Sequence, residues 1–205
     1  MSVNPVEHDV LLSVQSRWSP YRMLPQAIED HKLVQCFEAA RWASSSFNDQ
    51  PWYFLVAQRQ DEAAFSEMLG CLVEANQAWA SQAGALILTV MRTSFEYNGK
   101  PNRVALHDLG QASAHLALQA TALGLQVHQM GGVNLSVVRA TYEIPEGYEP
   151  QTAVAVGYPD LSEPVDEAGR QMQSRETGAR RRASLSTRVF ASKFGRPAAI
   201  VDGDQ

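Results

Sequence analysis

The chain of 205 residues has only two cysteines, Cys36 and Cys71, and both lie in apolar stretches. So low a cysteine content excludes a disulfide-dense secreted scaffold. The beginning of the chain also lacks the basic and apolar regions of a secretory signal peptide. We therefore expect two free, buried thiols in a reducing cytoplasm, although the sequence alone leaves a disulfide between them open.

Basic residues are too few to suggest a polyanionic partner. Lys and Arg number 17 against 22 Asp and Glu, which gives a formal net charge of −5. This balance argues against general nucleic-acid binding. No apolar run approaches the ~20 residues that span a bilayer, so no membrane partner is expected either. With 45% hydrophobic residues, the chain is instead expected to fold as one domain over 1–205.

Several motifs that carry chemistry are missing. No G-x-G-x-x-G follows a strand-like run and no G-x-x-x-x-G-K-[ST] occurs, so Rossmann and P-loop nucleotide sites are not supported. His107 and His115 have no third ligand at metal-binding spacing, and no metal site is predicted. The sequence shows no Ser-His-Asp set and no paired carboxylates, so no catalytic side chain is predicted.

Hydrophobic patterning predicts helices interspersed with buried strands. Helices are expected over 6–15, 25–41, 61–80, 108–125 and 135–142, and strands over 53–57, 84–91 and 152–158. The Ala-rich helix 108–125 is apolar almost all round, which indicates burial and close helix packing. Segments 92–104 and 160–179 are expected to be a surface loop and an extended, poorly packed connection.

A polar cluster lies between a predicted helix and a predicted strand, within Phe37–Val56. It contains the hydroxyl and amide side chains of Ser45, Ser46, Asn48 and Gln50. Side chains and free backbone N–H groups converge at such a corner, which can therefore bind a small molecule. The other interpretation is an ordinary solvated turn, because Ser and Asn are common turn residues.

Arginines gather in two further segments. The first, 16–22, contains Arg17, Trp18, Ser19 and Tyr21. The second is a run of three arginines in which Arg180 and Arg182 would point the same way if the backbone is extended. Two guanidiniums on one side suit a phosphate group, whereas solvated surface charge is the alternative for both segments.

One of these stretches resembles a family signature. The sequence AARWASSSFNDQPW, residues 39–52, is similar to the A-A-R-W-A-P-S-S-x-N-x-Q-P-W segment of the nitroreductase family, with Ser44 in place of proline. Further matches follow the family's order: R-x-S at 17–19, MGG at 130–132 with the strand 152–159, and basic-x-basic at 180–182. Tyr21 departs from the family, which has a basic residue there.

The resemblance covers about residues 14–195 and implies an α+β fold with a mostly antiparallel central sheet flanked by helices. It also implies an intertwined homodimer with two FMN sites, each built from both chains. Arg17, Ser19, Arg180 and Arg182 would hold the phosphate, and Asn76 with the 130–132 backbone would contact the ring. The full implied set of FMN contacts is Arg17, Trp18, Ser19, Tyr21, Ser45, Ser46, Asn48, Gln50, Asn76, Met130, Gly131, Gly132, Arg180 and Arg182.

The implied activity is hydride transfer in a ping-pong scheme. NAD(P)H, the cosubstrate, would reduce FMN and leave before an electron-poor acceptor such as a nitroaromatic, quinone or enone binds. The cofactor then carries the reaction, while the protein supplies binding, orientation and electrostatics. Two alternatives stay open: a non-enzymatic flavin-binding module, and another flavin enzyme on the same fold, of dehydrogenase, dehalogenase or flavin-fragmenting type.

Overall fold

The computed structural model describes residues 4–178 and 180–201, and a four-stranded antiparallel sheet forms its centre. The strands are β1 (Trp52–Gln58), β2 (Ala85–Arg92), β3 (Gln126–Met130) and β4 (Tyr148–Gly157). Their order across the sheet is β1-β2-β4-β3, and every neighbouring pair is antiparallel. The three predicted strands are confirmed within a few residues, and β3 is added to them.

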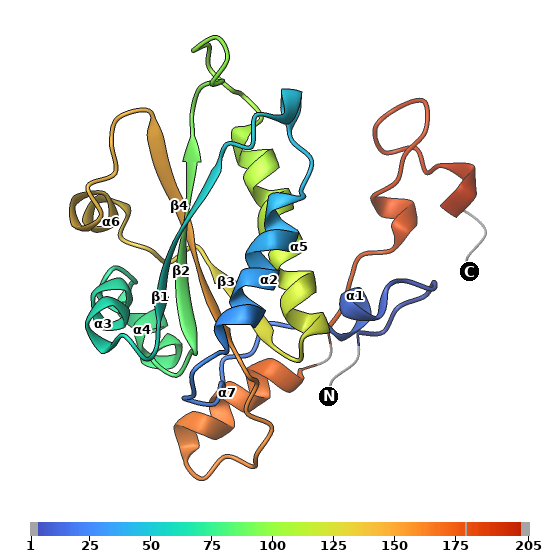
Figure 1. Ribbon diagram of the computed structural model, residues 1–205. Coiled ribbons are helices and arrows are strands. Elements are labelled where there is room, and N and C mark those ends of the chain that lie inside the picture. Colours follow the sequence, from blue (N-terminus) through green and yellow to red (C-terminus); the bar gives the residue numbers. More distant parts are fainter. Residues whose placement is uncertain (1–3, 179, 202–205) are drawn as a thin grey trace.

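Helices cover both faces of this sheet. They are α1 (Leu12–Ser16), α2 (Asp30–Arg41), α3 (Glu62–Gly70), α4 (Glu74–Ala80), α5 (Ala105–Ala122), α6 (Leu135–Thr141) and α7 (Glu167–Thr177), with short 3-10 turns at 46–48, 185–187 and 199–201. Figure 1 shows α2 and α5 on one face and α3, α4 and α6 on the other. This arrangement confirms the expected α+β fold.

The central strand β2 has apolar neighbours on both sides. Leu86 and Leu88 belong to the core cluster that contains Met68 of α3, whereas Ile87 belongs to the cluster that contains Leu116 of α5. Because side chains alternate along a strand, a strand covered on both faces needs apolar residues at every position. The continuous apolar run at 84–91 follows directly from this double burial.

The single helix expected over 61–80 is wrong. The structure has α3 and α4 instead, separated by residues 71–73. Leu72 forms a bridge with Val133, and Val73 donates its N–H to the carbonyl oxygen of Gly132 at 3.1 Å. Gly70 and the β-branched Val73 lower the local helix propensity, and the tertiary backbone contacts determine where the helix breaks.

The extended connection expected over 160–179 is also wrong in its second half. Residues 167–177 form α7, and Asp166 caps it by accepting the N–H of Gly169 at 2.7 Å. A side-chain N-cap of this kind satisfies one of the free N–H groups at a helix start. Residue 179 lies outside the described residues.

Two helix starts differ from the predictions. The helix predicted over 25–41 begins at Asp30, because Glu29 has extended backbone angles (φ −63°, ψ 130°) and residues 25–29 are irregular. The first predicted helix, 6–15, is only the short α1.

The expectation of free, buried thiols at Cys36 and Cys71 is confirmed. No helix among the described residues is long and apolar enough to cross a membrane.

Candidate functional site

Arg17 and Ser19 lie in an irregular segment after α1 that the beginning of β3 holds in place. Arg17 Nη1 donates to Ser19 Oγ at 3.3 Å. Trp18 N–H donates to Gln126 Oε1 at 3.1 Å, and Gln126 Nε2 donates to the carbonyl oxygen of Ser16 at 3.3 Å. Gln126 is almost fully buried, so these bonds fix the backbone on both sides of Arg17. The sequence did not predict this role for Gln126.

Arg180 joins the same place from the far end of the chain. Its Nη1 donates to the carbonyl oxygen of Arg17 at 3.0 Å and to Asn4 Oδ1 at 2.8 Å. Arg17, Arg180 and Arg182 line one hollow of about 260 Å³. The structure therefore brings the two predicted arginine segments together, although some 160 residues separate them in sequence.

The three guanidiniums repel one another. Burial and the neighbouring Arg182 lower the pKa of Arg17, and burial, Arg17 and Arg182 together lower the pKa of Arg180. Over residues 4–178 and 180–201, none of the three forms an ion pair with a carboxylate. Positive charge without a counter-charge favours an anionic ligand, because an anion would relieve the repulsion and accept hydrogen bonds from the planar forks. The fit of this site to a phosphate is therefore good.

A second hollow adjoins this arginine cluster at Arg17. It measures about 410 Å³. Arg17 and Ser19 provide polar groups, and α5 and β3 provide the walls through Ala114, Ala117, Leu118, Val127 and Gln129. An anion-binding group next to a largely apolar hollow suits a ligand with a charged end and an organic body.

The polar residues 44–50 form the expected corner before β1. Phe47, Asn48 and Gln50 have positive φ values of 54°, 56° and 47°. Asn adopts this left-handed conformation readily, but a bulky residue such as Phe rarely does. Strained backbone of this kind persists only where the surroundings hold it, and it often marks a functional site.

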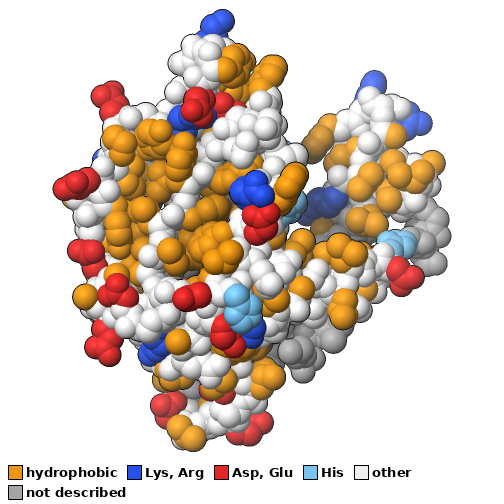
Figure 2. Space-filling model, in the orientation of Figure 1, with side chains coloured by type: hydrophobic (Ala, Val, Ile, Leu, Met, Phe, Trp, Pro, Cys, Tyr) orange, Lys and Arg blue, Asp and Glu red, His pale blue; other side chains and the backbone are white. Residues whose placement is uncertain are grey.

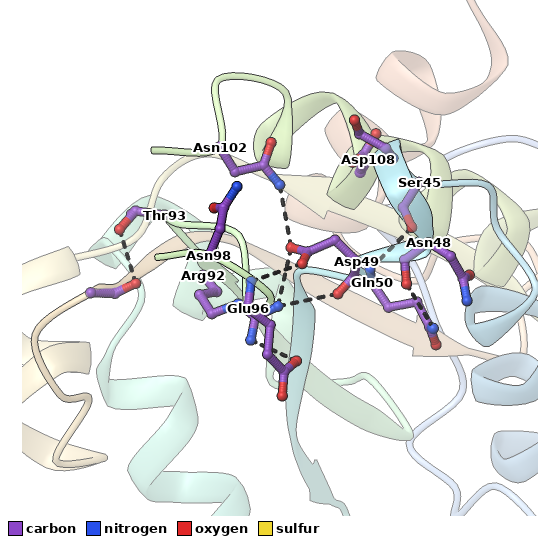
Figure 3. A network of polar contacts seen from close by, with 12 residues as sticks. Ser45, Asn48, Asp49, Gln50, Arg92, Thr93, Glu96, Asn98, Asn102 and Asp108 are labelled. Atoms are coloured by element: carbon purple, nitrogen blue, oxygen red, sulfur yellow. Dashed lines mark hydrogen bonds and ion pairs between the residues drawn. The ribbon is translucent and has the colours of Figure 1, made fainter. Parts of the chain in front are cut away.

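Hydrogen bonds from both ends hold the corner (Figure 3). Gln50 N–H donates to Ser45 Oγ at 3.0 Å, and Ser46 N–H donates to Asp108 Oδ2 at 3.1 Å. Asp108 is buried in the first turn of α5, so the helix directly fixes the corner. The polar cluster is therefore a turn fixed by hydrogen bonds to its own residues and to α5, rather than a freely solvated one.

Asp49 connects the corner to the loop after β2. Its carboxylate forms an ion pair with Arg92 at 3.1 Å and accepts the N–H of Glu96 at 2.9 Å. Figure 3 shows these contacts converging on Asp49 from the loop. The side chains of Asp49 and Arg92 are only 2% and 10% exposed. The pair thus anchors the loop 92–104, which the sequence had predicted only as a surface segment.

The corner and the arginine cluster occupy different places on the chain. The corner residues line a hollow of about 410 Å³ made by Phe47, Asn48, Asp49, Gln50, Glu96 and Tyr97. None of these residues lines the hollows at Arg17. One copy of the chain therefore does not bring all predicted cofactor contacts into one pocket.

A third group of predicted residues lies where β3 ends. Asn76 in α4 donates through Nδ2 to the carbonyl oxygen of Gly132 at 3.1 Å. Met130 is buried, whereas Gly131 is exposed. The two glycines do not have positive φ, so the glycine requirement comes from close approach at Gly132.

Gly132→Ala is expected to destabilise the protein because an added Cβ would lie 2.4 Å from Asn76 Nδ2 and 2.8 Å from Val73 Cγ2. Overpacking of this kind costs about 1–3 kcal/mol. Gly131→Ala is the matched control, since its Cβ would meet no atom within 4 Å. Thermal unfolding of both variants tests the prediction, and equal melting temperatures would contradict it.

Trp18 and Tyr21 pack inside the protein, and Arg22 forms an ion pair. The Trp18 indole is only 4% exposed and lines neither hollow at Arg17. The Tyr21 ring packs edge-on against the rings of Trp79 and His128, with distances between ring centres of 5.4 Å and 4.8 Å. Arg22, one position after the basic residue expected from the family, donates to Asp160 at 2.9 Å. None of these side chains adds a further cation to the three arginines of the cluster.

Together, the antiparallel fold and the arginine cluster define an α+β protein with a candidate nucleotide-cofactor site. A sequence model of the nitroreductase family matches residues 14–158, which is more than half of the chain. The chain therefore belongs to the nitroreductase family, and this membership supports an oxidoreductase.

Individual relatives agree with this assignment. An uncharacterized 15.4 kDa protein of Mycolicibacterium smegmatis is 30% identical over 141 residues, 69% of this chain and 90% of the relative. A protein of Ralstonia nicotianae with the provisional name NADH dehydrogenase/NAD(P)H nitroreductase is 24% identical over 158 residues, 68% of this chain and 80% of its own. A solved structure described as an oxidoreductase containing FMN has a TM-score of 0.84 and 28% identity, and covers 94% of this chain and 96% of its own.

Proposed function

We propose that the protein is an FMN-dependent oxidoreductase that passes hydride from NAD(P)H to an electron-poor acceptor such as a nitroaromatic, quinone or enone. The observation that carries this proposal is the cluster of Arg17, Arg180 and Arg182, whose charge no carboxylate balances within the described residues. A nucleotide phosphate is the matching anion, because guanidinium forks bind its oxygens in pairs. The descriptions of the FMN-containing structure and of the Ralstonia nicotianae relative support the cofactor and the cosubstrate.

Each group of residues has a part in this proposal. Arg17, Ser19, Arg180 and Arg182 would bind the phosphate, and FMN when bound would supply a ring that accepts and releases hydride. Asn76 uses one of its two amide N–H groups on Gly132, which leaves a second donor for the polar edge of the ring. Donors aimed at the ring would stabilise negative charge on it.

We also propose that two copies of the chain form a homodimer and that each site uses both. The corner hollow and the arginine hollows share no residue within one chain. Phe194 and Ile200 are 97% and 88% exposed, and Figure 2 shows apolar side chains gathered over this C-terminal segment, at the right of the view. Gly110 and Ala114 of α5 are exposed as well. A second copy that covered these surfaces would bury apolar area and could bring its corner to the arginine cluster.

Anaerobic reduction tests the proposed activity. The FMN-loaded protein is mixed with NADH or NADPH, and loss of the oxidised-flavin absorbance near about 450 nm is recorded before an acceptor is added. We expect bleaching by at least one nucleotide and recovery of the absorbance with a quinone or nitroaromatic. Tightly bound FMN that neither nucleotide bleaches would instead indicate a flavin-binding module without turnover.

A further inference from the structure

The segment that carries Arg17 and the end of α7 lie side by side in opposite directions. Arg180 Nη1 donates to the carbonyl oxygen of Arg17, and Glu176 Oε1 accepts the N–H of Tyr21 at 2.5 Å. These two contacts are four positions apart on each segment, 17 to 21 on one and 176 to 180 on the other. The order of these contacts shows that the two segments run in opposite directions, with Arg17 and Arg180 at one end and Glu176 at the other.

Glu176 links α7 to residues 21 and 22 of the segment that carries Arg17. It is only 6% exposed, and the same Oε1 also accepts the N–H of Arg22. The Arg175 guanidinium lies 5.8 Å from the centre of the Tyr21 ring. The side chain of Arg22 in turn forms an ion pair with Asp160 at 2.9 Å. The last turn of α7 is thus docked on the backbone that leads back to Arg17.

Burial and hydrogen bonding act in opposite directions on the pKa of the Glu176 carboxyl group. Burial raises the pKa of Glu176, despite the hydrogen bonds from Tyr21 and Arg22 that act in the opposite direction. A carboxyl group with a raised pKa in the folded state makes its full contribution to stability below its ordinary pKa and loses it as the pH rises through the raised value. What the carboxylate positions follows from the geometry: it accepts the N–H groups of two successive residues in the segment that leads back to Arg17.

We propose that Glu176 is a positioning residue for the anion site: by fixing α7 to the N–H groups of Tyr21 and Arg22, it sets where Arg180 and Arg182 lie relative to Arg17. This inference rests on the proposed binding of FMN. Only the phosphate end of the ligand depends on the spacing of the arginines. Loss of Glu176 reduces the preference for FMN over riboflavin, which has the same ring but no phosphate.

The test compares dissociation constants for FMN and riboflavin, measured by quenching of flavin fluorescence. In Glu176→Ala, the preference for FMN is expected to fall about ten-fold, in line with the loss of hydrogen bonds to a charged group. Glu176→Gln keeps an oxygen that can accept both N–H bonds and is expected to restore most of the preference. Glu167→Ala is the matched control on the same helix, because its partner is the exposed Arg170 and it does not contact the 17–22 segment.

Each outcome has a definite meaning. A reduced preference in Glu176→Ala with recovery in Glu176→Gln supports the positioning role. An unchanged preference, or an equal loss of both ligands, overturns it, because a merely structural residue would affect ring and phosphate binding alike. If Glu176→Ala does not fold, Glu176→Asp, which keeps the charge but shortens the reach, replaces it and is expected to show a smaller loss of preference. A wild-type protein without preference for FMN would refute the proposed phosphate site itself, a failure distinct from that of Glu176.

Discussion

Replacing both Arg17 and Arg182 with alanine is expected to weaken FMN binding by roughly a hundred-fold or more, because each removes a charge-assisted contact to phosphate of about 1.5–3 kcal/mol. The two guanidiniums lie in one hollow, where burial and the neighbouring Arg182 lower the pKa of Arg17. Their loss therefore removes repulsion from the protein while it removes attraction for the ligand. Fluorescence titration with FMN measures the effect.

The control for this double variant is Arg181→Ala with Arg188→Ala. Both residues are exposed, and neither lines the hollow at Arg17. The control removes the same number of positive charges, so it corrects for a general change of electrostatic field. Equal FMN affinities in the two double variants would show that the arginine cluster does not bind the phosphate.

Asp49→Ala is expected to lower the free energy of unfolding by about 3 kcal/mol, since it removes the buried carboxylate beside Arg92 and leaves only the 76% exposed Glu96 as an ion-pair partner among the described residues. Asp49 also accepts the N–H of Glu96 at 2.9 Å, and the Asn102 amide lies 3.5 Å from it. Arg92 Nε is already buried without a hydrogen-bond partner among the described residues, so the solvent-exposed Glu96, at 2.8 Å from Nη1, would compensate the buried charge only in part. Urea denaturation, followed by circular dichroism, gives the free energy directly.

A surface ion pair provides the comparison. Arg139 and Glu149 approach to 2.7 Å, but their side chains are 36% and 51% exposed. Exposed pairs contribute about 0–1 kcal/mol, so Glu149→Ala should change the stability little. Equal effects of Asp49→Ala and Glu149→Ala would mean that the corner and the loop 92–104 are not held together by the buried pair.

The sequence predicted those parts of the fold whose signals are local. β2 is a continuous apolar run because both of its faces are covered, and the corner at 44–50 follows from polar residues between a helix and a strand. The start of α7 could also have been predicted, because Asp166 stands three positions before Gly169 as a helix cap. The break between α3 and α4 could not, since it depends on the backbone bonds of Leu72 and Val73 to residues 132–133.

The candidate site shows the same division. The resemblance to the nitroreductase family named Arg17 and Arg180, and the structure brings them together. The residues that hold them in place went unpredicted: Gln126 and Glu176 bond to backbone atoms more than 100 residues away. A single buried polar residue has no periodic or local signature, so only the tertiary structure reveals which backbone groups it satisfies.

The central claim is that arginines of one chain and the corner of another together hold one FMN. A mixed dimer of two differently tagged variants tests it most directly: one chain carries Arg17→Ala and Arg182→Ala, and its partner carries Asn48→Ala and Gln50→Ala. If each site combines both chains, one of the two sites in the mixed dimer has both wild-type halves. Each parent variant alone has none.

The measurement is the amount of FMN bound per purified mixed dimer. The account predicts one FMN per dimer with wild-type affinity, while both parent proteins bind FMN weakly. A mixed dimer that binds FMN no better than its parents, or a protein that remains a monomer and still binds FMN with wild-type affinity, would contradict it.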